Sequence, residues 1–324
     1  MTEPEAAGVD VVAAAPTSPT RSADDATPTS VRVAIVLYEN ALDEMWRCLR
    51  SLVRSVERTG EDPRLAPNVV TIAIGDCSGG LMIKEADLAA LRTMAGDRAS
   101  VDYTWFGRNL GHSAGCNALA QDAPEDALLF LNPDCYVSPR MLGRLLSALR
   151  DPLVAAVDAR QIPCEHPKWF DPVTGEQSWA SGACLLVRTP WFREAGGFDA
   201  DAFPSYVNDV DLSWRLRLAG GRVVHQPNAV VFHDKRLVES ATVAPTRIEL
   251  YEGLLGRLLL ATRFSREDVV EETIELVGAH GSTEQQRAVA EFERRRREKA
   301  LPEALAGADQ VAEFVDGEYG RRRF

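Results

Sequence analysis

The sequence ALLFLNPD occupies residues 127–134 and combines the two features that decide the fold. Its first five residues are apolar and predict a short buried strand. The strand ends at Asn132, Pro133 and Asp134, which are residue types typical of a turn. In an open α/β sheet, ligands bind beyond the carboxyl ends of the strands. A carboxylate in this place is therefore the first candidate for a functional group.

Three similar apolar runs precede this stretch and are predicted to be strands of the same sheet. They occupy residues 31–37, 69–74 and 101–106. Between the first two, apolar residues recur at helical spacing over residues 42–56, which predicts a helix with one buried face. Strands that alternate with helices predict an α/β fold with a mainly parallel sheet and helices on both faces.

The second half of the chain is expected to continue the sheet. Residues 179–187 are predicted to be extended, and residues 208–219 to be helical, ending at a glycine pair. Two short strands are expected over residues 222–225 and 229–233.

The pattern predicts three regions along the chain. Residues 1–30 are rich in Ala, Thr, Pro and Ser and predict a disordered tail. Residues 31–240 form the predicted α/β domain. Residues 241–324 carry apolar residues at helical spacing and predict a C-terminal helical region.

Composition excludes several classes of protein. The chain has 324 residues, 45% hydrophobic and 26% charged, as expected of a globular protein. A net charge of −12 opposes binding to nucleic acid or to an anionic membrane. No apolar run approaches the ~20 residues that span a bilayer, and the N-terminus lacks a signal-peptide pattern. Six scattered cysteines without a C-x-x-C pair favour free thiols. We therefore expect a cytoplasmic protein, with peripheral membrane association left open.

Single residues leave alternatives open. Asp134 suits Mg²⁺ or Mn²⁺, which take few protein ligands beside phosphate oxygens and water, but Asn-Pro-Asp is also a common turn. Asp209 lies in the first turn of a predicted helix, where it could be a general base or simply favour the helix dipole. His233 ends a predicted strand and is either a ligand or a core histidine. Gly111 lies in a small-residue loop that suits either close approach to a ligand or packing.

In this order, the motifs resemble those of the family 2 glycosyltransferases, which have the GT-A fold, and in particular the bacterial rhamnosyltransferase-like branch. The resemblance extends over about residues 31–235 and includes Asn132-Pro133-Asp134 in the place of a D-x-D motif. The other matching motifs are Tyr38-x-Asn40, Gly75-Asp76-x-Ser78, Asn109-x-Gly111 with Asn117, Ser181-Gly182-Ala183, Gly196-Gly197-Phe198-Asp199 and Asn208-Asp209-Val210-Asp211-Leu212-x-x-Arg215.

The resemblance implies an inverting, metal-dependent transfer of a sugar from a nucleoside-diphosphate sugar, with a dTDP- or UDP-sugar as donor and rhamnose as one candidate sugar. Asp134 would hold Mg²⁺ or Mn²⁺ on the diphosphate with help from His233, and Asp209 would be the general base. Asp76 would contact the nucleobase. The resemblance also implies a nucleotide-binding half over residues 31–134 and an acceptor half over residues 135–240. The implied donor-binding residues are Tyr38, Asn40, Asp76, Asn109, Gly111, Asn117, Asn132 and Gly182.

Asn208 departs from the family pattern, which usually has Glu directly before the Asp that acts as the general base. Loss of an acidic neighbour predicts a lower pKa for Asp209 and a weaker base. A sugar nucleotidyltransferase and a catalytically inactive nucleotide-binding scaffold are the alternatives. No glycine-rich basic loop follows residues 31–37 to hold a triphosphate, which counts against the nucleotidyltransferase.

The acceptor is left open between a glycan, a lipid-linked sugar and a small molecule. Its pocket is expected to involve residues 166–177 and the C-terminal helices, and Trp169, Phe170 and Trp179 are candidates to stack on it. The C-terminal helices could also support a homodimer. No nucleic-acid partner and no integral membrane segment are expected.

Overall fold

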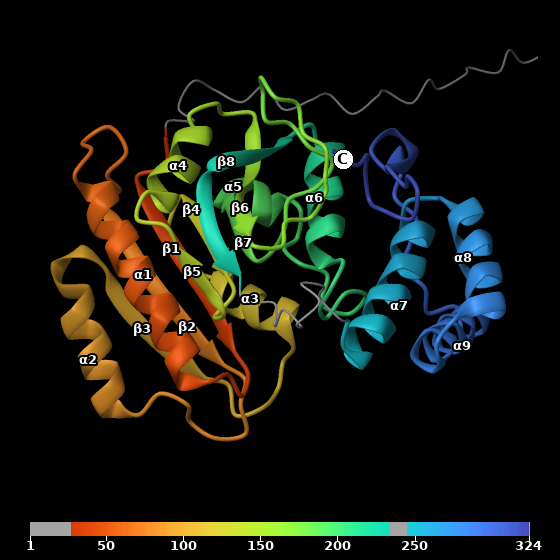
Figure 1. Ribbon diagram of the computed structural model, residues 1–324, viewed down its shortest axis with the longest axis horizontal. Helices are drawn as coiled ribbons and strands as arrows, with labels where there is room; N and C mark the ends of the chain where they lie inside the picture. The colour runs from red at the N-terminus through yellow and green to blue at the C-terminus, as the bar shows by residue number, and fades with distance from the viewer. Residues whose placement is uncertain (1–26, 234–244, 324) are drawn as a thin grey trace, which may run out of the picture.

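The computed structural model describes residues 27–233 and 245–323 (Figure 1). Ser30 already belongs to the first strand, so order begins earlier than residue 31. The backbone N–H of Thr29 donates to Asp126 Oδ2 at 2.8 Å, which fixes the start of that strand. Residues 1–26 of the predicted tail and residues 234–240 of the predicted acceptor half lie outside the described residues.

One eight-stranded sheet organises the described part of the chain, in the order β3-β2-β1-β4-β7-β6-β8-β5. Four of its seven strand pairings are parallel and three are antiparallel, so the sheet is mixed rather than uniformly parallel. The strands are β1 (Ser30–Leu37), β2 (Val69–Asp76), β3 (Ser100–Trp105), β4 (Ala127–Leu131), β5 (Cys135–Val137), β6 (Val154–Ile162), β7 (Cys184–Arg188) and β8 (Arg222–His233).

Helices cover both faces of the sheet, as the α/β prediction requires. One buried cluster joins the sheet to α1, α2 and α4, and a second joins the opposite face to α3, α5 and α6. Successive side chains of β1 point to opposite faces of the sheet, so Val33 and Ile35 belong to the first cluster and Ala34 to the second. The helices are α1 (Leu42–Gly60), α2 (Glu85–Ala95), α3 (His112–Ala120), α4 (Met141–Ala148), α5 (Thr189–Glu194) and α6 (Asn208–Leu218).

Three sequence expectations in the second half need correction. Strand β6 was not predicted, because Asp158, Arg160 and Gln161 interrupt its apolar pattern. Residues 222–233 form one strand, β8, and not the two short strands predicted. Its pairing with β6 continues along the strand with shifts in register. Only Cys184–Arg188 of the segment expected to be extended from residue 179 is a strand.

The C-terminal region contains three helices, α7 (Arg247–Arg263), α8 (Glu267–His280) and α9 (Thr283–Arg297), followed by a mostly irregular segment. Figure 1 shows these helices on the α6 side of the molecule, away from α1 and α2. They share a third buried cluster with the sheet domain, in which Trp214 of α6 packs edge-on against Phe264 and Phe314. No helix of the described ranges has both the length and the apolar character needed to cross a membrane.

Arg263 of α7 fastens this region to α6. Its Nη1 donates to Asp211 Oδ1 at 2.9 Å, and its Nη2 pairs with Asp199. Asp211 is fully buried and also accepts from Arg215 Nη2 at 2.6 Å, so two guanidinium groups balance its charge. The C-terminal region is thereby fixed to the helix that begins at Asn208 and contains Asp209.

Replacement of Arg263 by methionine should lower the free energy of unfolding by about 3 kcal/mol, because it leaves Asp211 short of a cation in a buried place. Urea denaturation followed by tryptophan fluorescence measures the change. Arg297→Met, at an exposed position of α9, is the matched control and should change stability by less than about 0.5 kcal/mol. Equal effects of the two variants would contradict the buried role of Arg263.

Candidate active site

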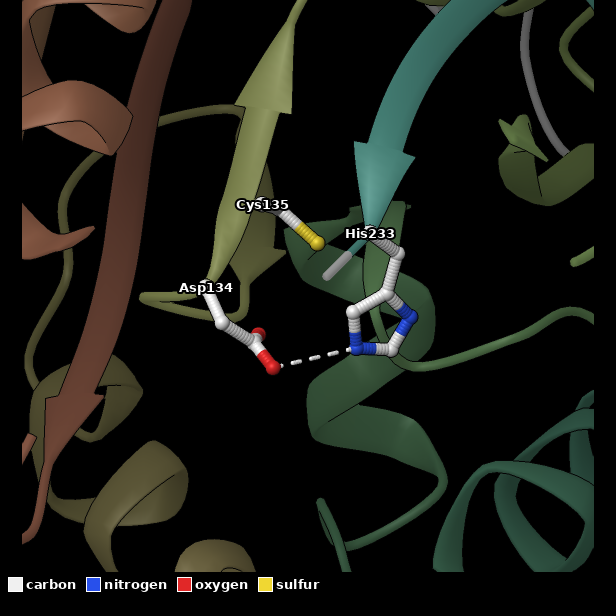
Figure 2. A group of neighbouring side chains, drawn as sticks. All are labelled: Asp134, Cys135 and His233. Atoms are coloured by element: carbon white, nitrogen blue, oxygen red, sulfur yellow. Dashed lines mark ion pairs between the residues drawn. The ribbon is translucent and has the colours of Figure 1, made fainter. Parts of the chain in front are cut away.

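Strand pairing brings Asp134 and His233 together. Cys135 in β5 pairs with His233 at the end of β8, so Asp134, one residue earlier, lies next to the histidine. The Asp134 Oδ2 atom is 3.4 Å from His233 Nε2, and Figure 2 shows the carboxylate and the imidazole turned toward each other. The alternative of a simple turn for Asp134 does not account for this pairing with a histidine that lies 99 residues away in the numbering.

Gln161 of β6 orients the histidine. Its Oε1 lies 2.9 Å from His233 Nδ1, and its Nε2 donates to Ser181 Oγ at 2.7 Å. With Nδ1–H donating to Gln161, the lone pair of Nε2 faces the Asp134 carboxylate, so two acceptors lie opposite each other. Metal-bound histidines are commonly oriented by such a second hydrogen bond. Adjacent ligands of an octahedral Mg²⁺ or Mn²⁺ lie roughly 3 Å apart, close to the separation seen here.

Cys135 is the third potential ligand in this group, since its Sγ lies within 4.8 Å of the ligand atoms of both other residues. Its side chain is fully buried, and its Sγ donates to Ala183 O at 3.5 Å. Mg²⁺ and Mn²⁺ prefer oxygen and nitrogen to a thiol. The donor set that fits a divalent cation is therefore Asp134 with His233.

Asp209 is the second residue of α6 and is partly buried. Its Oδ2 accepts from the backbone N–H of Gly182 at 2.8 Å, and its Oδ1 accepts from Val210 N at 2.9 Å. A Cβ on residue 182 would lie 3.4 Å from the Cβ of Asp209, an ordinary van der Waals contact, so the two segments lie side by side. Gly182, predicted to bind the donor, therefore contacts the candidate base.

The segment Ser181–Ala183 connects the two acidic residues. Gly182 holds Asp209, and the Ala183 carbonyl accepts from Asn132 N at 3.0 Å and from Cys135 Sγ. Asp134 lies between Asn132 and Cys135 in the chain, so one short segment contacts Asp209 and both ends of the turn that carries Asp134. This is the arrangement expected if a metal ligand and a base act on one substrate.

Burial raises the pKa of Asp209 above its ordinary value of 3.8, although the Gly182 N–H and the Lys168 charge act in the opposite direction. This rise comes from burial and leaves the expected effect of Asn208 in place of Glu a prediction. Asn208 does not contact the Asp209 carboxylate; its Nδ2 donates to Ser113 Oγ at 3.0 Å and lies 3.3 Å from His112 Nδ1. A raised pKa makes Asp209 a stronger base than a solvated aspartate.

A buried polar network behind Asp209 was not foreseen from the sequence. Lys168 Nζ donates to Asp158 Oδ2 at 2.6 Å and to Trp179 O at 2.9 Å, and His225 Nδ1 lies 2.8 Å from Asp158 Oδ1. Burial acts to raise the pKa of Asp158, but Lys168 and His225 outweigh it and hold the pKa well below its usual range. The available signal was Asp158 itself, an acid within the apolar run of β6.

The predicted donor-binding residues at the ends of β1 and β2 mostly shape loops. Asn40 Oδ1 accepts from Tyr38 N at 2.9 Å, whereas the Tyr38 ring is half exposed. Asp76 is fully buried and accepts from Ser78 N, Met82 N and Tyr103 Oη. Burial opposes its ionisation, yet these bonds lower the pKa of Asp76. These partners occupy the Asp76 carboxylate in this structure, and its contact with a nucleobase stays a prediction.

The remaining donor-side residues also bond within the protein. Asn109 Oδ1 accepts from Gly111 N at 2.8 Å, and Gly111 has a φ of 77°, a conformation that favours glycine. Asn117 bonds through both ends of its amide to the backbone of Phe198, and its donor contact stays a prediction. The Asn132 side chain bonds to His112, which also lies next to Asn208.

A mixed sheet with helices on both faces and an acid–histidine pair at the strand ends are the features expected of the GT-A fold. Residues 33–182 match the model of Glycosyl transferase family 2. Residues 33–182 therefore form a family 2 glycosyltransferase domain, as the motifs predicted.

One similar protein is the N-acetylglucosaminyl-diphospho-decaprenol L-rhamnosyltransferase of Mycobacterium tuberculosis (strain ATCC 25618 / H37Rv), which is 32% identical over 176 residues, 40% of this chain and 57% of that protein. The match thus spans little more than half the length of that relative.

Two solved structures support the fold alone. GalNAc-T7 with UDP, GalNAc and Mn²⁺ has a TM-score of 0.60 at 16% identity, over 86% of this chain and 56% of that one. Residues 1–349 of S. aureus TarS in complex with UDP-GlcNAc have a TM-score of 0.57 at 12% identity, over 84% and 82%. They confirm the predicted GT-A fold.

Proposed function

We propose that this protein transfers a sugar from a nucleoside-diphosphate sugar to an acceptor hydroxyl with inversion at the anomeric carbon. The observation that carries the proposal is the placement of Asp134–His233 and Asp209 around the segment Ser181–Ala183. Family membership supports a glycosyltransferase, and the two groups supply the parts that an inverting transfer requires: a site for the diphosphate and a base for the acceptor.

Asp134 and His233 would hold a Mg²⁺ or Mn²⁺ ion. When bound, the ion offsets the charge that grows on the nucleoside-diphosphate leaving group. Asp209 takes the proton of the acceptor hydroxyl as the acceptor oxygen bonds to the anomeric carbon. The bond from that carbon to the diphosphate oxygen breaks, and its electron pair leaves with the nucleoside diphosphate. Gly182 keeps the Asp209 carboxylate aimed by its 2.8 Å hydrogen bond.

For the substrates, we propose a dTDP- or UDP-sugar donor, with rhamnose as the leading sugar. The M. tuberculosis relative supports rhamnose and, by its name, an acceptor sugar on a diphosphate-linked lipid. The donor would lie over the loops after β1, β2 and β3, where the half-exposed Tyr38 ring is available to a nucleobase.

The test is to incubate the protein with a panel of nucleotide sugars and Mn²⁺ and to follow release of nucleoside diphosphate. Diphosphate release that depends on the metal supports the transferase. Pyrophosphate release would favour the sugar nucleotidyltransferase, and donor binding without turnover for any acceptor would favour the inactive scaffold.

The raised pKa of Asp209 predicts the pH dependence of this activity. A general base works only when deprotonated, so kcat/KM should rise with pH through the pKa of Asp209 and level off above it. We expect the midpoint of this limb clearly above 3.8. Lys168→Met should move the midpoint to higher pH, because the Lys168 charge lowers this pKa. A midpoint at the ordinary aspartate value, or no shift in the variant, would count against Asp209 as the base.

A further inference from the structure

A crevice lies between the loop around residues 166–169 and the C-terminal segment 318–322. Trp179 forms part of its lining, together with Lys168, Trp169, Glu318, Arg321 and Arg322. The family match ends at residue 182, so four of the ten lining residues come from a part of the chain outside the match. It is one of the hollows that the described residues form, and it belongs to neither the Asp134–His233 pair nor the donor-side loops.

Backbone pairing holds the C-terminal segment against the loop. Lys168 and Arg322 form an antiparallel bridge, Trp169 N donates to Arg321 O at 2.8 Å, and Arg323 N donates to Pro167 O at 2.8 Å. Gly320 packs so closely that a Cβ there would lie 2.9 Å from the Cβ of Ser178. The arginines therefore have a fixed backbone beneath them.

The crevice adjoins the candidate base. Lys168 Nζ donates to the Trp179 carbonyl, and Trp179 is three residues before Gly182, which holds Asp209. The Lys168–Asp158 pair is also tied to this segment, because Ser181 N donates to Asp158 Oδ2 at 2.8 Å. The crevice is therefore linked to Asp209 through Lys168 and the segment 179–182.

The charges of the lining suit an anion. Lys168 is matched by buried Asp158, and Arg322 pairs with Glu318 at 2.9 Å on the exposed surface, where such a pair is weak. Among the described residues, Arg321 has no side-chain hydrogen bond or ion pair. Arg321 and Arg322 share the lining of the crevice with the exposed ring of Trp169. Guanidinium groups bind phosphate through paired N–H donors.

We propose that this crevice is the acceptor subsite and that Arg321 and Arg322 bind a phosphate attached to the acceptor sugar. The sugar would lie between this phosphate and Asp209, beside Trp169. The inference rests on the proposed function, which it deepens by giving the acceptor class: a sugar phosphate ester, either free or linked to a lipid.

The test measures binding through tryptophan fluorescence, because two tryptophans line the crevice. A hexose 1-phosphate is titrated into the full-length protein, the Arg321→Gln/Arg322→Gln double variant, the Asp134→Ala variant and the control Arg297→Gln, which changes an exposed arginine of α9. We expect the double variant to bind at least about tenfold more weakly, as loss of charge-assisted hydrogen bonds implies. The Asp134→Ala and Arg297→Gln proteins should bind like the parent.

Several outcomes would overturn the proposal. Binding lost in Asp134→Ala but kept in the double variant would place the phosphate at the metal pair. Equal affinities for the free hexose and for the hexose 1-phosphate would show that the protein does not recognise the phosphate. Because the titration needs no turnover, failure of the proposed transferase activity is seen separately, in the assay of diphosphate release.

A second arm identifies the source of the phosphate. Vesicles that contain a prenyl phosphate are compared with the soluble ester. Preference for the vesicles, lost in the double variant, supports a lipid-linked acceptor, whereas binding of the soluble ester alone supports a free sugar phosphate. Where an acceptor turns over, the double variant should raise its KM about tenfold and leave kcat and the donor KM unchanged.

Discussion

Replacement of Asp134 by alanine should abolish the effect of Mn²⁺ on donor binding and reduce turnover by about 10³-fold. The loss follows because His233 alone is a poor site for a cation that needs several ligands, and because the diphosphate charge is then not offset. Calorimetric titration of the nucleoside diphosphate, with and without Mn²⁺, measures the binding, and diphosphate release measures the turnover. Asp134 is partly exposed, so the variant should fold like the parent protein.

Asp122→Ala is the matched control, since this acid is exposed on the loop after α3 and should leave the metal dependence unchanged. His233→Ala should weaken metal-dependent binding less than Asp134→Ala, because it removes a neutral ligand and keeps the charged one. If the Asp134→Ala protein bound the diphosphate with undiminished metal dependence, the ion would be held elsewhere and the assignment would fail.

Replacement of Asp209 by asparagine should reduce kcat by about 10³-fold and leave donor binding within about twofold of the parent. General base catalysis contributes 10²- to 10⁴-fold, and the amide cannot accept the proton of the acceptor. The amide oxygen can still accept from Gly182 N, so the start of α6 should keep its geometry. Single-turnover transfer and a binding titration of the donor separate the two effects.

Asp201→Asn is the control, because Asp201 is an exposed acid eight residues earlier in the chain. If the Asp209→Asn protein lost both donor binding and activity, the result would indicate a structural role for Asp209. Full activity in this variant would assign the proton transfer to another group.

Sequence reasoning succeeded where the signal is local. The apolar runs before Asp76 and Asn132 predicted β2 and β4 correctly, because buried parallel strands are short, apolar and followed by polar turns. The approach of Asp134 to His233 followed from motif order and is seen in the pairing of β5 with β8. The roles assigned to these residues stay predictions until the variants are measured.

The unforeseen parts depend on contacts between distant residues. Gln161 could not be recognised because its strand carries three polar residues and lacks a clear period. The burial of Asp76 and the raised pKa of Asp209 come from neighbours that only the folded chain brings together. Arg263 is one arginine among many in the sequence, and its importance follows from the buried Asp211 it meets.

The packing of Trp214 against Phe264 and Phe314 has a consequence for protein engineering. A fragment cut near residue 240 would expose this apolar surface to water. It would also remove Arg263 and leave Asp211 with Arg215 as its remaining cationic partner. We therefore expect the fragment to aggregate. Exchange of C-terminal regions between relatives would succeed only if the contacting surface of α6 were exchanged with them. The same restriction applies in evolution: changes in helices α7–α9 must be matched by changes on α6, the helix that contains Asp209.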